Sequence, residues 1–239
     1  MNNFLNCHSL SNTLANSDVM PVKSISNLVE KTSENPNTFL TKPRLYSDKS
    51  KTLFMCSCDF QLPLYHKKLF NDLGVYFPSE LLRAVNKRQA EFLAGRYVAQ
   101  QAMLSSGFLN NQFKSTQAPI IPIGKNRSPI WPTGIQGSIT HNNVSALCAV
   151  TTATSIHTDY IGIDVESLLT AVTASEIKST IHTSKESELL ISQGMSDNVA
   201  TTLIFSAKES LFKALYPVIG EYFGFECAKV VEFSLKDAR

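Results

Sequence analysis

The chain has 239 residues, of which 43% are hydrophobic and 18% charged, and its formal net charge is +2. This length allows one or two domains with a substantial core. The nearly balanced charge argues against general nucleic-acid binding, so any affinity for anions must be local. No apolar run approaches the roughly 18 residues of a transmembrane helix, and the N-terminus lacks the pattern of a signal peptide.

The five cysteines are scattered and include no CxxC pair. They suit neither a disulfide framework nor a zinc site, so we expect a reduced, cytoplasmic compartment, with any membrane association made through partner proteins. Residues 1–45 are rich in Asn, Ser and Thr and contain three prolines. This composition predicts a poorly ordered extension that carries little of the chemistry.

The remaining sequence mixes helical and strand patterns without a strict βαβ repeat, which predicts an α+β protein. A strand is expected at 53–60, a helix that starts near Pro78 with Ser79 as N-cap, and one long helix over 87–105. Four prolines between 115 and 134 predict an extended path. Further expected elements are strand-like segments within 137–150 and at 160–166, helical structure over about 173–193, a helix opening at Ser206, and a closing strand at 230–235.

The segment IGIDVE at 161–166 alternates apolar and acidic residues. In a strand, Asp164 and Glu166 would project from one face and could share a hard cation. Gly162 favours such a site, since it permits the close approach of a ligand or a second chain. An edge strand with a solvated acidic face would show the same pattern, so the geometry alone leaves both interpretations open.

The segment FSAKESLFK at 205–213 offers a third carboxylate, Glu209, with Lys213 one helical turn later. A helix start is also a favourable place for phosphate. However, Ser206 and Glu209 have the spacing of a capping box, and Glu209 with Lys213 is an ordinary i,i+4 pair. Either feature would explain these residues without catalysis.

Two further segments suggest anion binding. In GSITH at 137–141, backbone N–H groups, Thr140 and His141 could surround a pyrophosphate, although for a single histidine we favour a turn into a strand with His141 bonded to backbone. In KRQAEFLAGR at 87–96, Arg88 and Arg96 fall about 80° apart around a helix, where they could bracket a phosphate. A solvated basic face is the alternative. Lys125, in the proline-rich stretch, could add another cation.

Together and in this order, these segments resemble the Sfp-type 4'-phosphopantetheinyl transferases, most closely the enterobactin synthase component D group. The resemblance covers about residues 80–225. It rests on KRxxEFxxGR (87–96), PxWPxG (129–134), GSITH (137–141), GIDVE (162–166) and FSAKESxxK (205–213). The chain ends soon after Phe233, where members of this family continue through another strand or hairpin.

The resemblance implies a pseudo-dimer of two similar α/β halves, with coenzyme A in the cleft between them. Residues 46–150 would form the coenzyme A-binding half, and residues 151–239 the Mg²⁺-binding, catalytic half. The implied reaction transfers the 4'-phosphopantetheine arm of coenzyme A to a serine of an apo carrier protein and releases 3',5'-ADP. Mg²⁺ and coenzyme A are therefore the expected cofactor and co-substrate.

The resemblance also implies a role for each residue of the site. Asp164, Glu166 and Glu209 would hold Mg²⁺, and Glu209 is also the candidate base, directly or through water. The remaining expected contacts are Lys213 and His141 to the pyrophosphate, Lys208 as an assisting cation, Arg88 and Arg96 to the 3'-phosphate or its neighbours, and Lys125 and Thr140 to the nucleotide side.

The expected partners are aryl, peptidyl or acyl carrier proteins, above all those of a siderophore synthetase complex, and we expect a monomer that binds no nucleic acid. One alternative is a non-catalytic scaffold that docks carrier domains in a synthase complex. The presence of all three acidic residues and Lys213 counts against it. Another is a different Mg²⁺-dependent phosphotransferase, but no GxxxxGK[ST] loop is present.

Overall fold

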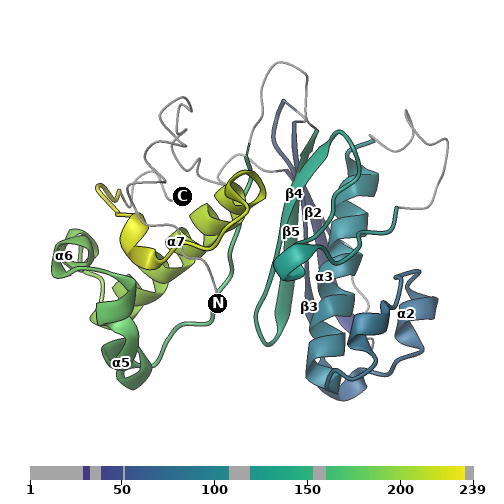
Figure 1. Cartoon of the computed structure of the whole chain (residues 1–239), viewed down its shortest axis with the longest axis horizontal. Coiled ribbons are helices and arrows are strands. Elements are labelled where there is room, and N and C mark those ends of the chain that lie inside the picture. The colour runs from purple at the N-terminus through teal and green to yellow at the C-terminus, as the bar shows by residue number, and fades with distance from the viewer. Residues whose placement is uncertain (1–28, 33–38, 51, 108–118, 153–159, 235–239) are drawn as a thin grey trace. The chain divides into compact units, whose positions relative to one another are not determined.

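The computed structural model describes residues 29–32, 39–50, 52–107, 119–152 and 160–234 (Figure 1). The chain divides into two compact units, residues 28–165 and a second unit that includes residues 166–239. We call them the sheet unit and the helical unit. The division falls between Val165 and Glu166, whereas the sequence-based division was placed between residues 150 and 151.

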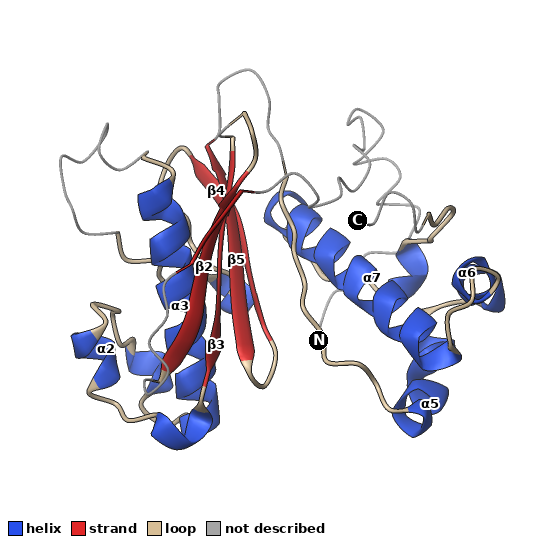
Figure 2. Ribbon diagram, turned by 180° about the vertical axis from the view of Figure 1, so that it is seen from behind, coloured by secondary structure: helices blue, strands red, loops and turns tan. Residues whose placement is uncertain are grey.

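The sheet unit contains an antiparallel sheet of five strands in the order β1-β2-β3-β5-β4, drawn in red in Figure 2. The strand predicted at 53–60 is confirmed with the same bounds, and the strand-like region 137–150 forms a hairpin. The strands are β1 (Val29–Thr32), β2 (Leu40–Ser47), β3 (Leu53–Phe60), β4 (Ile135–His141) and β5 (Ser145–Thr152).

Strands β1 and β2 correct part of the expectation for residues 1–45, since both lie wholly or partly within that segment. Leu40 and Leu45 of β2 pack against the hydrophobic core, which provides the apolar burial that the composition did not suggest. Pro43 is accommodated because the register of β2 with β3 shifts between Thr41 and Arg44. At such a bulge a proline does not interrupt a regular ladder.

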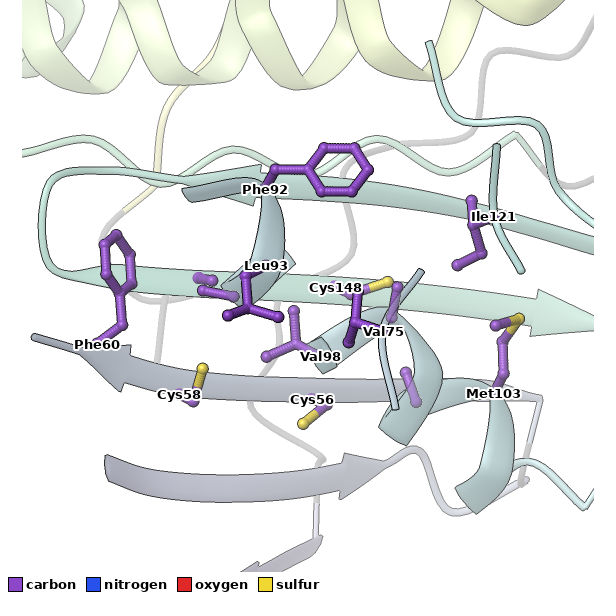
Figure 3. Close-up of a cluster of buried hydrophobic side chains, with 14 of the residues drawn as sticks. Cys56, Cys58, Phe60, Val75, Phe92, Leu93, Val98, Met103, Ile121 and Cys148 are labelled. Carbon is purple, nitrogen blue, oxygen red and sulfur yellow. The ribbon is translucent and has the colours of Figure 1, made fainter. Parts of the chain in front are cut away.

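The long helix α3 (Asn86–Ser105) packs on one face of this sheet and confirms the helix predicted over 87–105. Its buried Leu93, Val98 and Met103 belong to the same core cluster as Cys56 of β3 and Cys148 of β5 (Figure 3). Those two cysteines are register partners, so their strands present them side by side. The core of the sheet unit therefore lies between α3 and the sheet.

Short elements connect these parts of the sheet unit. The helix expected from Pro78 is one 3₁₀ turn, in which the Ser79 hydroxyl bonds to Glu80 and makes no cap. The sequence prediction of an N-cap at Ser79 is therefore wrong. The short elements here are η1 (Leu62–Leu64), α2 (Leu69–Asp72), η2 (Ser79–Leu81) and η3 (Lys125–Arg127).

In its described residues the helical unit contains α5 (Ala171–Ile181), α6 (Ser184–Ile191), α7 (Asp197–Ile219) and the 3₁₀ turn η4 (Phe225–Cys227). The helical stretch predicted over 173–193 is thus two helices. A capping box starts α6, because Thr183 and Glu186 exchange side-chain-to-backbone hydrogen bonds. The apolar core cluster of this unit is small and consists of Ile181, Leu190, Ala200 and Ile204 with partly buried neighbours.

Three further predictions of secondary structure are wrong. Residues 160–166 form no strand, and neither do residues 230–234. Ser206 does not open a helix, since α7 begins at Asp197 and continues to a left-handed Gly220. The α+β class is confirmed, and the pseudo-dimeric arrangement stays a prediction from the resemblance. Among the described residues, no helix has the length and apolar character needed to span a membrane.

Candidate functional site

The segment 160–165 is anchored to β4 through two buried side-chain hydroxyls. The backbone N–H of Ile163 donates to Ser138 Oγ, and that of Val165 donates to Thr140 Oγ1, both at 3.1 Å. Side chains stand roughly perpendicular to a sheet, so these bonds place the segment over a face of β4. This explains why the predicted strand is absent: its alternate N–H groups bond to hydroxyls instead of to the carbonyls of a neighbouring strand.

Thr140 also fixes the carboxylate of Asp164. Its hydroxyl donates to Asp164 Oδ1 at 3.0 Å while it accepts the Val165 N–H. Thr140 is 3% exposed and Ser138 4% exposed, so this contact is sheltered from water. Thr140 was predicted to contact the nucleotide side of coenzyme A. Its hydrogen bond to Asp164 was not predicted from the sequence.

The three carboxylates predicted to bind Mg²⁺ are distributed over the two units. Asp164 is half-buried in the sheet unit, whereas Glu166 is exposed and Glu209 half-buried, both in the helical unit. Within the described part of the chain, no three His, Cys, Asp or Glu side chains are gathered as a metal-binding group. The carboxylate oxygens of Asp164, Glu166 and Glu209 are nevertheless of the chemical type that Mg²⁺ prefers as ligands.

His141 and Arg88 are brought together in the sheet unit. His141 ends β4, and its Nε2 lies 3.4 Å from a terminal guanidinium nitrogen of Arg88 on α3. Arg88 also lies 3.8 Å from the carboxylate of Glu91. The structure therefore joins residues from two of the predicted anion-binding segments, and Glu91 balances part of the positive charge of Arg88.

Arg96 lies two turns further along α3 and is largely buried. Its Nε donates to the carbonyl of Ile121 at 3.0 Å, and its guanidinium lies over the ring of Phe92 at 4.6 Å. Burial, together with the nearby charge of Arg88, lowers the pKa of Arg96 to about 10. It also lines a small pocket with Tyr76, Gln100 and Ile120. The side chain is held in place and still reaches the edge of this hollow.

Lys125 lies apart from these residues in sequence and is exposed on the turn η3. Its turn is closed by an isolated bridge between Ile123 and Pro129. Asn126 and Arg127 adopt left-handed backbone conformations there. The lysine is therefore presented on a tight, defined loop of the sheet unit.

Glu209 and Lys213 lie in the second half of α7, both half-buried. The spacing of four residues places them on one side of the helix. Because α7 begins at Asp197, neither residue is near a helix N-terminus, and Glu209 is not part of a capping box. Its carboxylate therefore need not serve as a cap in addition to any metal contact.

Lys208, which was predicted to be an assisting cation, is surrounded by partners within the helical unit. Its ammonium is 2.8 Å from Glu186 Oε1, and both side chains are at least 95% buried. It also donates to the carbonyls of Ile181 and Phe225 at 2.8 and 3.1 Å. The three N–H groups of the ammonium are thus used within the helical unit.

Glu186 completes this network and was missed by the sequence interpretation. Its Oε2 accepts from the backbone N–H and hydroxyl of Thr183, and its Oε1 accepts from the backbone N–H of Val230. Burial raises the pKa of Glu186, but the bonds from Lys208, Thr183 and Val230 outweigh it and lower the pKa to about 2. The TSKE sequence at 183–186 was a readable capping-box signal for this residue.

Ser138 was also missed as an individual contributor. It lies within the GSITH segment, and strand alternation already places Ser138 and Thr140 on one face of β4, opposite to Ile139. What the sequence could not supply was the partner, because the hydrogen bonds run to a segment about 25 residues later in the chain.

Two family models match the chain. The 4'-phosphopantetheinyl transferase N-terminal domain matches residues 77–151, and the 4'-phosphopantetheinyl transferase superfamily matches residues 160–238. The first match includes the residues of α3, β4 and η3 described above. The second match includes Asp164, Glu166, Glu209 and Lys213.

The chain is similar to several known proteins. It is 39% identical over 136 residues to enterobactin synthase component D of Escherichia coli O157:H7, an alignment that covers 57% of this chain and 59% of that protein. It is 33% identical over 178 residues to the protein of the same name from Salmonella typhi, with 74% and 68% covered. The 4'-phosphopantetheinyl transferase Npt of Nocardia iowensis is 30% identical over 159 residues, with 66% and 64% covered.

These matches define the class of protein: the chain belongs to the 4'-phosphopantetheinyl transferase superfamily. Within that superfamily it is similar to the proteins named enterobactin synthase component D. The chain spans 59% of the length of the Escherichia coli relative.

Proposed function

We propose that this protein transfers the 4'-phosphopantetheine arm of coenzyme A to a serine hydroxyl of an apo carrier protein. The serine oxygen forms a bond to the β-phosphorus, and the bond from that phosphorus to the bridging pyrophosphate oxygen breaks. The serine proton passes to a base, and 3',5'-ADP leaves with the bonding electron pair. The carrier protein retains the phosphopantetheine as a phosphodiester.

One observation carries this proposal: two family models of this superfamily match successive parts of the chain and together include every candidate residue of the site. The contact between Thr140 and Asp164 joins the residues of one match to those of the other. Relatives named 4'-phosphopantetheinyl transferase support the same reaction class.

Asp164, Glu166 and Glu209 are proposed to hold Mg²⁺. A set of three carboxylates fits this hard cation, and the fixed, half-buried carboxylate of Asp164 is a suitable first ligand. When bound, the ion would supply positive charge to a pyrophosphate and so favour the transfer of its phosphoryl group.

The protein's own residues account for the remaining chemistry in this proposal. Glu209 takes the proton of the incoming serine hydroxyl, directly or through water. Lys213 and His141 bind the pyrophosphate oxygens, and Arg88, beside His141, extends the positive charge. Arg96 takes the 3'-phosphate or its neighbours, since its buried guanidinium reaches a small pocket, and Lys125 and Thr140 contact the nucleotide side.

Carrier domains of a siderophore synthetase are the proposed partners. The support for this choice is the name of the relatives, enterobactin synthase component D. Serine-bearing aryl and peptidyl carrier domains are therefore the first substrates to test, and a fatty-acid carrier protein is the natural comparison.

The test is to incubate the protein with coenzyme A, Mg²⁺ and each apo carrier domain, and to follow the mass of the carrier by mass spectrometry. We expect a gain equal to one phosphopantetheine on at least one carrier. The gain should disappear with a Ser→Ala carrier or with excess chelator. Modification that continues undiminished in chelator would contradict the Mg²⁺ assignment.

The variant Asp164→Ala separates catalysis from scaffolding. It should abolish transfer and leave the fold intact, because an anionic ligand is lost. Near-normal transfer by this variant would disprove the assignment of Asp164. If the unmodified protein binds carrier domains and transfers nothing to any of them, the protein is a docking scaffold and not an enzyme.

A further inference from the structure

Two buried hydroxyls of one strand hold the segment that bears Asp164. Ser138 and Thr140 are two residues apart on β4 and so share one face of the sheet. The N–H groups that they accept, those of Ile163 and Val165, are also two residues apart. Because the hydroxyls and the N–H groups both recur at every second residue, β4 can bind an extended segment that is not itself part of the sheet.

Thr140 makes the third hydrogen bond of this arrangement, to the carboxylate itself. A hydroxyl has one proton to donate and can accept hydrogen bonds at the same time. In Thr140 the oxygen accepts from Val165 N–H, and the proton is directed to Asp164 Oδ1. One side chain therefore fixes both the backbone that follows Asp164 and the carboxylate orientation.

We propose that Ser138 and Thr140 are positioning residues, which hold the 160–165 segment so that the Asp164 carboxylate is oriented for cation binding. This inference rests on the proposed function, since it gives a purpose to the orientation of Asp164. Ligating carboxylates depend on hydrogen bonds from a surrounding shell, and loss of such a partner typically weakens metal binding about 10- to 100-fold.

The two hydroxyls have unequal roles. Among the described residues, the Ser138 hydroxyl bonds only to backbone, at Ile163, so removal of this hydroxyl loosens the segment one residue before the carboxylate. Thr140 contacts the carboxylate directly. Thr140→Val, which keeps the branched shape, should therefore weaken cation binding more than Ser138→Ala. Thr140→Ser keeps the hydroxyl and should restore most of the affinity.

The chain offers a matched control for the loss of a hydroxyl-to-carboxylate bond. The Ser145 hydroxyl of β5 donates to Asp59 Oδ1 at 2.8 Å, in the same sheet but without contact to Asp164 in the described hydrogen bonds. Ser145→Ala removes a bond of the same kind. It should leave both cation binding and the exchange of the Ile163 and Val165 amides unchanged.

Two readouts test the proposal in the full chain. Amide hydrogen exchange, followed by NMR without ligands, should become faster at Val165 in Thr140→Val and at Ile163 in Ser138→Ala. Binding of Mn²⁺ in the presence of coenzyme A, followed by electron paramagnetic resonance, should weaken about 10- to 100-fold in Thr140→Val and about 2- to 10-fold in Ser138→Ala. Circular dichroism should confirm that the variants are folded.

The outcomes distinguish this proposal from the proposed function. If the unmodified protein transfers phosphopantetheine and Thr140→Val binds Mn²⁺ with unchanged affinity, the positioning role is overturned. If the unmodified protein neither transfers phosphopantetheine nor binds Mn²⁺, the proposed function fails. The amide exchange data then decide whether Ser138 and Thr140 anchor the segment that bears Asp164. Faster exchange at Ile163 and Val165 then still supports the anchoring of Asp164, whereas unchanged exchange overturns it.

Discussion

The sheet unit and the helical unit are stabilised in different ways. In the described residues, the core cluster of the sheet unit contains 21 buried residues packed between α3 and the strands, including Leu93, which is fully buried. The corresponding cluster of the helical unit contains four. At the centre of the helical unit is instead a buried ion pair, Glu186 with Lys208, which joins α6, α7 and the segment at Val230.

The two units also differ in charge. Residues 28–165 contain 14 Lys and Arg against 9 Asp and Glu, a formal charge of +5, whereas residues 166–239 contain 7 against 10, a charge of −3. Most candidate residues follow this difference, since the cations Arg88, Arg96 and Lys125 belong to the first unit and the acids Glu166 and Glu209 to the second; Asp164 and Lys213 are the exceptions. The near-neutral total thus conceals a division of the two kinds of charge between the units.

The sheet unit is therefore stabilised mainly by apolar burial, whereas the helical unit depends also on a buried ion pair. When a side chain in an apolar core is truncated, the loss of stability grows with the volume of the cavity that is left. A buried ion pair tolerates loss of one partner poorly, because the other charge stays buried without compensation. Substitutions in the two units should therefore give distinguishable signals.

The largest effect is expected from Lys208→Met. Removal of the ammonium leaves Glu186 buried with its strongest partner gone, which should destabilise the helical unit by about 3–5 kcal/mol. The loss should appear in the helical circular dichroism signal during urea unfolding. Fluorescence of Trp131, the single tryptophan, reports the sheet unit and should shift less.

Lys178→Met is the matched control for that substitution. Lys178 pairs with Asp197 at 3.0 Å, but both side chains are more than 40% exposed, so the loss should stay below about 1 kcal/mol. The double replacement of Glu186 and Lys208 by apolar residues should cost less than Lys208→Met alone. Equal costs for the two lysine substitutions would refute the structural role of the buried pair.

The second-largest effect should destabilise the sheet unit more than the helical unit. Leu93→Ala removes a fully buried side chain from α3 and should destabilise the sheet unit by about 2–5 kcal/mol. Here the Trp131 fluorescence transition should shift more than the helical signal of α5 to α7. Leu82→Ala, at a position 63% exposed, is the control and should change little. A uniform shift of both signals would mean that the units unfold as one.

Acid should weaken the helical unit through Glu186. Its pKa is lowered to about 2 in the folded chain from an ordinary value of 4.5. The stabilisation is therefore present above about pH 4.5 and is lost as the pH falls toward 2, because the unfolded state binds the proton first. The urea midpoint of the helical signal should fall over this range. In Glu186→Gln that part of the pH dependence should be absent, and persistence of the full acid sensitivity would assign it to other carboxylates.

The parts of the fold that could be predicted are those with strong local patterns. The apolar segment 53–60 was predicted as a strand with the bounds that β3 has, and the helical sequence over 87–105 placed α3 within one residue of its start. The alternation of apolar and acidic residues misled at 160–166. It does not reveal whether alternate N–H groups bond to a neighbouring strand or to hydroxyls such as those of Ser138 and Thr140.

In the candidate site, too, the spacing of residues along the chain could be predicted, but their partners in the folded structure could not. The spacing of Ser206 and Glu209 matches a capping box, yet it occurs in the middle of α7 because helical sequence extends back to Asp197. Lys208 was grouped with the transfer residues because it belongs to the FSAKESxxK segment on which the family resemblance rests. Its partner Glu186 lies on another helix, and only the folded chain brings the two together.

The smallest expected effect is a difference in thiol reactivity between the two units. Burial raises the pKa of Cys56 to about 12 and also raises the pKa of Cys58 and Cys148, so these core thiols should react with an aromatic disulfide reagent only when the sheet unit opens. Cys227, in η4 of the helical unit, is only half-buried and should react first.

Cys7 lies outside the described residues, so the experiment is best made in a Cys7→Ser background. Addition of Lys208→Met should then speed the reaction of Cys227, because Lys208 donates to the carbonyl of Phe225 in the same turn. The three core thiols should keep their slow rate, since their burial depends on α3 and the sheet. If all four thiols accelerate together, the helical unit supports the sheet unit, and the separate accounts of their stability do not hold.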